Sequence, residues 1–122
     1  MGYKLIGTGF SVSNKNDVEG TFVIIKDVSD VIKLIQGEAE GKICYAEQAG
    51  TTTLAPILSR ISGVVCSTGS FGSHLAIVSR EYEIPAFMST KIEYDLEKLD
   101  GKKVKMHTVE DSDRGELYLW ID

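Results

Sequence analysis

Residues 63–85 constrain the fold more than any other part of this chain. They begin with the apolar run 64–66, Val-Val-Cys, which is typical of a short buried strand. Apart from Phe71, residues 67–73 are small and rich in glycine and serine, as expected of a loop. Apolar residues then recur at helical spacing until Pro85, which stops the helix. The segment therefore predicts a strand, a loop and a short helix in immediate succession.

His74 falls in the first turn of this predicted helix, with Ser73 as the expected N-cap. The backbone N–H groups and partial positive charge of a helix N-terminus stabilise an anion by ~0.3–1 kcal/mol. Gly69 and Gly72 would let the backbone approach that anion closely. A neutral imidazole can attack phosphorus. These features leave two interpretations of His74 open, a phosphoryl-accepting group or a polar surface residue.

The same residues resemble the phosphohistidine motif of phosphoenolpyruvate-utilising enzymes, found in the swivelling or mobile domain of pyruvate phosphate dikinase and phosphoenolpyruvate synthase. That motif is approximately G-G-x-T-[SC]-H-x-A-I-[VI]-[AS]-R-E-x-x-I-P-A. The residues that fill it in register are Gly69, Ser73, His74, Ala76, Ile77, Val78, Ser79, Arg80, Glu81, Ile84, Pro85 and Ala86. A match of this length is highly specific.

The resemblance extends over essentially the whole chain. Residues 41–46 are similar to the family's G-x-I-x-V-A strand, and Thr52 and Thr53 fall in its threonine-containing turn. Residues 100–104 and 113–117 resemble its closing hairpin. The resemblance implies a compact swivelling β/β/α phosphohistidine domain of the α/β class.

Two positions depart from the family pattern. Ser70 stands where the second glycine is usual, and Gly72 stands where a threonine usually lies two residues before the histidine. In the dikinases that threonine is the regulatory phosphorylation site. Glycine cannot be phosphorylated, so this regulation is not expected here.

The resemblance implies that His74 is a covalent phosphocarrier, which moves by domain rotation between an ATP-grasp nucleotide-binding domain and a phosphoenolpyruvate or acceptor site. Gly69, Ser70, Gly72 and Ser73 would form the phosphate loop. Further candidates for a supporting role are Thr52, Thr53, Arg80 and Glu81. Because the chain has no P-loop, ATP-grasp residues or barrel, Mg²⁺ and ATP or phosphoenolpyruvate are expected on partner domains, with no cofactor on this chain.

The length of 122 residues predicts a single domain over residues 1–122. The net charge of −5 and the lack of a basic, aromatic patch argue against a nucleic-acid partner. With no long apolar run and no signal peptide, we expect no membrane association and a cytoplasmic location. Cys44 and Cys66 lie in apolar segments and are expected to be buried thiols, and no metal site is predicted.

A chain of this kind should not turn over alone. It would be either a separate small subunit, as in split systems resembling phenylphosphate synthase, or a domain of a larger polypeptide. The alternative is a docking or regulatory module that keeps the fold without transfer, and the residues at positions 70 and 72 motivate it. A sugar-phosphotransferase first enzyme shares the histidine motif but has a helical insertion that this chain lacks.

The expected elements follow in chain order. Strands are expected at 3–7, 20–26, 42–46, around 64 and at 86–88, then as two closing strands, with helices at 28–35, 53–61 and from 74 to about 83.

Overall fold

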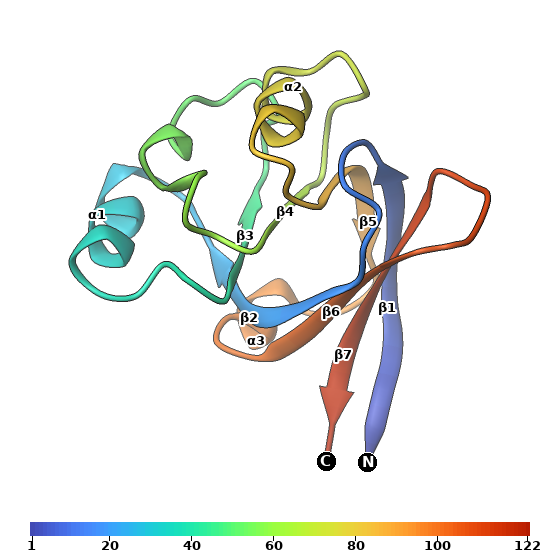
Figure 1. Ribbon diagram of the computed structural model, residues 1–122. Coiled ribbons are helices and arrows are strands. Elements are labelled where there is room, and N and C mark those ends of the chain that lie inside the picture. The colour runs from blue at the N-terminus through green and yellow to red at the C-terminus, as the bar shows by residue number, and fades with distance from the viewer.

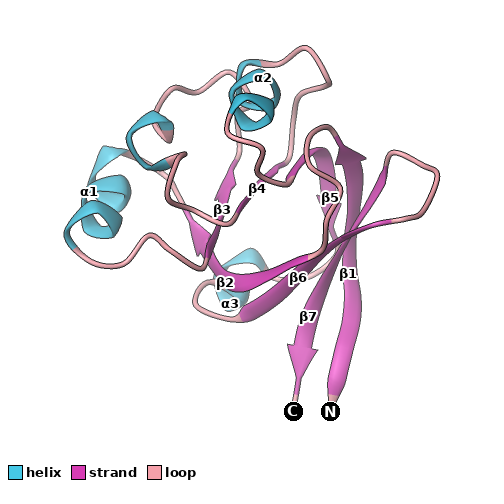
Figure 2. Ribbon diagram, in the orientation of Figure 1, coloured by secondary structure: helices cyan, strands magenta, loops and turns pink.

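A computed structural model describes residues 1–122 (Figure 1). The strands are β1 (Gly2–Ser11), β2 (Val18–Ile24), β3 (Lys42–Ala46), β4 (Gly63–Cys66), β5 (Ala86–Ile92), β6 (Lys103–Thr108) and β7 (Arg114–Ile121). The helices are α1 (Val28–Gln36), the 3₁₀ turn η1 (Ala55–Ile57), α2 (His74–Glu81) and α3 (Leu96–Leu99). Strands and helices mix along the chain, as the expected α/β class requires (Figure 2).

The strands close into one barrel in the order β1-β5-β4-β3-β2-β6-β7. The pairs β2–β3, β3–β4 and β4–β5 are parallel, and the remaining pairs are antiparallel. The carboxyl ends of parallel strands meet at one edge of a sheet, where ligand sites of α/β proteins usually lie. The loops that follow β3 and β4 therefore emerge side by side, and the second of them leads to His74.

Strands β3 and β4 are buried on both faces. Along β3, Ile43 and Tyr45 pack inside the barrel, whereas Cys44 and Ala46 belong to a second apolar cluster. This alternation follows from the two-residue period of a strand. The second cluster also contains Leu75 and apolar residues of α1, so these helices cover the outer face of the parallel strands.

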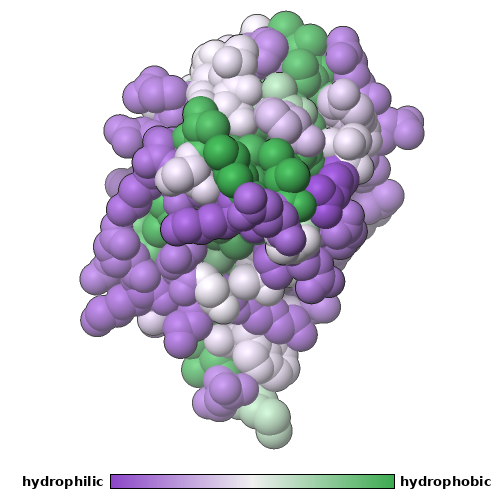
Figure 3. Space-filling model, turned by 90° about the vertical axis from the view of Figure 1, so that its left-hand side faces the viewer, coloured by the Kyte–Doolittle hydropathy of each residue, from purple (hydrophilic) through white to green (hydrophobic).

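Helix α1 begins with a capping box. The side chain of Asp27 accepts hydrogen bonds from the backbone of Ser29 and Asp30, and the Asp30 carboxylate accepts from the backbone of Asp27. The hydrogen bond from the Ser29 hydroxyl, followed by those from the backbone N–H groups of Asp30 and Ser29, lowers the pKa of Asp27. Figure 3 looks onto the α1 side of the molecule and shows apolar side chains among charged ones. Val28, Ile32 and Ile35 are the exposed apolar residues of this helix.

The predicted helix at 53–61 is wrong, because the segment forms only the 3₁₀ turn η1. Its apolar residues have helical spacing and are buried, but the hydrogen bonds Ile57 N–H to Leu54 O and Arg60 N–H to Ile57 O span three residues. Pro56 lies in the first turn of this segment, where a missing N–H is tolerated, so the apolar spacing alone did not distinguish a helix from short turns. The sequence also missed α3 and ended the strand at 86–88 too early, since β5 continues to Ile92.

The other expected elements are confirmed, with small differences at their ends. At the far end of the barrel from α2, Gly2 pairs with Ile121, so the two termini lie next to each other (Figure 1). None of the helices is both long and apolar enough to cross a membrane.

The hydroxyl of Ser79 is buried within α2 and has no hydrogen-bond partner. Replacing Ser79 by alanine should raise the free energy of unfolding by about 1 kcal/mol, because the unpaired hydroxyl is removed and alanine favours a helix. Ala76→Ser places a hydroxyl at another fully buried position of the same helix and should lower the free energy of unfolding. Urea denaturation measures both, and a destabilised Ser79→Ala would show that the hydroxyl has a partner.

Candidate functional site

His74 is the first residue of α2 and its side chain is exposed. The imidazole forms no hydrogen bond or ion pair within the chain, unlike the imidazole of His107, whose Nδ1 lies 2.8 Å from Asp17 Oδ1. Both ring nitrogens of His74 are therefore available to a group that approaches from outside.

The loop before His74 is closed by Ser73. The Ser73 hydroxyl accepts a hydrogen bond from the N–H of Ser70 at 2.8 Å, and the backbone N–H of Ser73 donates to the Ser70 carbonyl at 3.1 Å. Ser73 holds the N-cap position as predicted, but its side chain does not cap the helix. The expected capping bond is wrong because the hydroxyl already serves the loop.

One of the backbone donors at the start of α2 is already used. The N–H of Leu75 donates to the Ala49 carbonyl at 3.0 Å, which fixes the first turn of the helix onto the loop after β3. The N–H groups of Gly72 and His74 meet no acceptor within the chain. These two groups and the N–H of Ala76, which also meets no acceptor within the chain, are the donors that remain at the start of α2 for an anion.

The loop after β4 is tied to its neighbours on both sides. The Thr68 hydroxyl donates to the Glu47 carbonyl and accepts the Ala49 N–H, both at 3.0 Å. From β5, Ser89 donates its N–H to the Thr68 carbonyl at 2.9 Å and its hydroxyl to the Gly69 carbonyl at 2.6 Å. The loop that presents His74 is therefore held in one conformation.

The sequence missed the roles of Ala49 and Ser89. Ala49 follows β3 and Ser89 lies on β5, and both strands pair with β4. The two residues reach the His74 loop only through this pairing, and neither belongs to a sequence motif. The one sequence feature that could have indicated these contacts is the hydroxyl of Thr68, because Thr68 lies in the loop before His74.

The two loop glycines have different surroundings. Gly69 has a φ of +95°, and a Cβ there would overlap the Cβ of Ala49 and approach Ser73 Oγ to 2.9 Å. Nothing lies within 4 Å of a Cβ at Gly72. Gly69 is thus required by the fold, whereas the position of Gly72 can accept a side chain.

Arg80 does not point at the site but holds its loop. Its Nη1 donates to the carbonyls of Phe71 at 2.9 Å and Val12 at 3.1 Å, and the guanidinium lies 3.8 Å from the centre of the Phe71 ring. Arg80 forms no salt bridge within the chain. Glu81 is exposed at the other end of α2, ~10 Å along the helix from His74. The structure therefore does not bring Glu81 to the imidazole.

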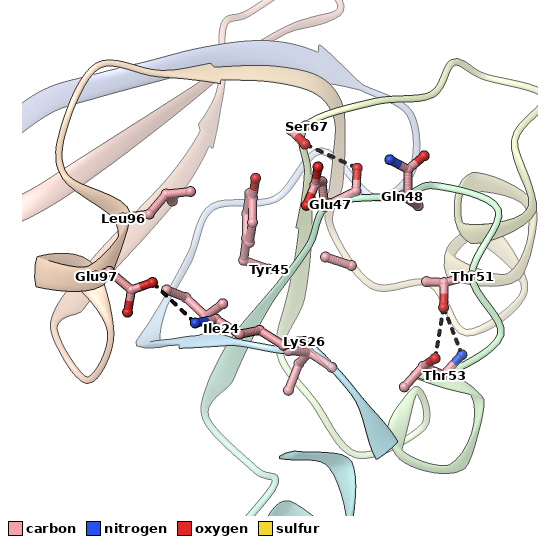
Figure 4. A pocket seen from close by; sticks show the side chains of 12 residues that line it. Ile24, Lys26, Tyr45, Glu47, Gln48, Thr51, Thr53, Ser67, Leu96 and Glu97 are labelled. Atoms are coloured by element: carbon pink, nitrogen blue, oxygen red, sulfur yellow. Dashed lines mark hydrogen bonds and ion pairs between the residues drawn. The ribbon is translucent and has the colours of Figure 1, made fainter. Parts of the chain in front are cut away.

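A cavity of about 580 Å³ lies beside the carboxyl ends of β2 and β3 (Figure 4). Thr53 lines it, together with Thr51, whose hydroxyl donates to that of Thr53 at 2.9 Å. Thr52 is exposed and outside the cavity, and His74 does not line it either. The cavity holds no nucleophile comparable to His74, so the candidate site is the loop and not the cavity.

Neither cysteine offers a second nucleophile. Both are free and buried, as their apolar context predicts. Burial raises the pKa of Cys44 to about 12 and also raises the pKa of Cys66. No group of three or more His, Cys, Asp or Glu side chains is placed to hold a metal ion.

Gly69→Ala should lower the free energy of unfolding by at least about 2 kcal/mol, because it combines a strained positive φ with a steric overlap. Gly72→Ala is the matched control and should change it by less than about 0.5 kcal/mol. Thermal and urea denaturation measure both variants. Equal effects at the two positions would contradict this description of the loop.

Comparison of the sequence with known proteins identifies the family of this chain. A family model described as "PEP-utilising enzyme, mobile domain" matches residues 38–107. Phosphoenolpyruvate synthase of Pyrococcus furiosus is 30% identical over 102 residues, which cover 84% of this chain and 11% of that protein. The probable phosphoenolpyruvate synthase of Pyrococcus horikoshii is 33% identical over 72 residues, or 59% of this chain and 8% of the relative.

The chain thus spans only about a tenth of the length of the curated relatives that it matches. The family match covers more than half of the chain and includes the β4 strand, the His74 loop and α2. The chain belongs to the family of mobile domains of phosphoenolpyruvate-utilising enzymes.

Proposed function

We propose that this chain is the phosphocarrier component of a phosphotransferase, and that His74 accepts a phosphoryl group and passes it to an acceptor. What supports this most is the position of His74. Its imidazole is exposed and unpaired at the start of α2, beside the free N–H groups of Gly72 and His74. Family membership supports the same role.

The chemistry is a nucleophilic displacement at phosphorus. An imidazole nitrogen forms a bond to phosphorus while the bond from phosphorus to the leaving oxygen breaks, and that oxygen leaves on enolpyruvate or on the nucleotide. The second step repeats this with the acceptor and restores the free imidazole. Backbone N–H groups beside the ring would stabilise the phosphoryl oxygens in both states.

The donor must lie on another domain. The chain offers no carboxylate cluster for Mg²⁺, and its loops contain no nucleotide-binding motif. We propose that an ATP-grasp or phosphoenolpyruvate-binding partner holds the donor and Mg²⁺. The relatives are about ten times longer than the matched region, so they have room for such partners.

Rotation of the whole domain between two partners would fit the swivelling β/β/α fold. The loop of His74 is fixed by hydrogen bonds to β5 and to the loop after β3, so it is not the part that moves. The termini lie together at the opposite end of the barrel (Figure 1). A domain attached through that end could turn as a rigid body.

The alternative, a docking module without transfer, was motivated by the residues at positions 70 and 72, and the structure of the loop gives it no support. Ser70 uses its backbone N–H to close the loop, and Gly72 lies in open space. Neither departure from the family pattern disturbs the presentation of His74.

Wild type, His74→Ala and His107→Gln should be incubated in an extract of the source cells with labelled phosphoenolpyruvate or with ATP labelled at both its β- and γ-phosphates. Intact-protein mass spectrometry at alkaline pH should find an acid-labile phosphate on wild type and His107→Gln but not on His74→Ala. The label that transfers identifies the donor. Wild type that stays unlabelled in an extract with active phosphoenolpyruvate-dependent phosphotransferases would favour the docking module.

A further inference from the structure

Two shallow grooves lie next to the His74 loop, with volumes of about 500 and 430 Å³. Phe71 and Arg80 line the first, Phe10 and Lys91 line the second, and Asp113 is common to both. We call their combined lining the groove face. It is continuous with the site, because Phe71 stands three residues before His74 in the loop.

The groove face carries the two most exposed aromatic side chains of the protein. Phe71 is 66% exposed and Phe10 is 59% exposed. The Phe71 ring stacks on the Arg80 guanidinium, which also binds the Phe71 carbonyl. An exposed aromatic ring that is already held in place loses little entropy on binding, which is typical of an interface anchor.

The charge of the groove face is opposite to that of the protein. The chain has a net charge of −5. The charged residues lining the grooves are Lys15, Arg80, Lys91 and Arg114 against Glu83 and Asp113. Lys15 pairs with Asp113 and Arg114 pairs with Glu116, which leaves Arg80 and Lys91 against Glu83. Lys91 is exposed and forms no ion pair within the chain. An acidic surface would therefore be attracted to this face and repelled by the rest of the molecule.

We infer that the groove face docks the partner domain that supplies the phosphoryl group, and that the contacting surface of that partner is acidic around an apolar pocket for Phe71. This inference rests on the proposed function, since the donor must reach His74 from a docked partner. The exposed apolar residues of α1, Val28, Ile32 and Ile35, form the rival surface, but none of them is hydrogen-bonded to the His74 loop.

The test compares two ways of phosphorylating His74. Transfer in cell extract needs the partner, whereas phosphoramidate phosphorylates an exposed imidazole directly and releases ammonia. In extract, Lys91→Glu should slow labelling about tenfold at low salt, and the loss should shrink near ~0.5 M salt. Phe71→Ala should slow it about fivefold or more at either salt concentration. Lys4→Glu, a charge reversal at an exposed and unpaired lysine near the start of β1, should label as wild type does.

Phosphoramidate should label all of these variants at rates within about twofold of wild type, because none of them changes the imidazole itself. Unchanged extract rates for both Lys91→Glu and Phe71→Ala would overturn the docking inference while leaving the proposed function intact. Selective slowing by Ile32→Ala would place docking on α1 and also overturn it. Wild type labelled by phosphoramidate but never by extract would overturn the proposed function, and the docking inference with it.

Discussion

The hydroxyl of Thr68 joins the two loops on which the rest of the site depends. It donates to the Glu47 carbonyl and accepts the Ala49 N–H, so the chain after β3 and the chain after β4 become one unit. The Ala49 carbonyl then receives the N–H of Leu75, which fixes the start of α2. This is possible only because β3 and β4 are parallel neighbours whose carboxyl ends lie side by side.

The phosphocarrier role that we propose for this chain sets two requirements for the site. Its histidine must be open to large partners, yet it must stand in a defined orientation for transfer. Here the loop supplies the orientation through its ties to Ser89, Arg80 and Ala49, and the imidazole itself is left without a partner. Mobility would then belong to the whole domain and not to the loop.

The sequence predicted the parts of the fold that local chemistry controls. The strand around 64–66 and the position of His74 at the start of α2 follow from the apolar pattern and from the small residues of the loop between them. The predicted helix at 53–61 was wrong because buried apolar residues at helical spacing also fit the short 3₁₀ turn that the segment forms. The bond from Arg80 to Val12 joins residues 68 positions apart, and no local pattern contains it. Long-range contacts of this kind explain why the supporting residues were predicted less well than the histidine.

Backbone amide NMR of the protein before and after phosphorylation by phosphoramidate tests the central claim most directly. If the site is preformed, the largest shifts should be those of the Gly72 and His74 amides, and the amides of Thr68, Gly69 and Ser89 should stay nearly unchanged. Shifts spread through the whole loop, or centred on His107, would show that the loop does not present His74 in the way described.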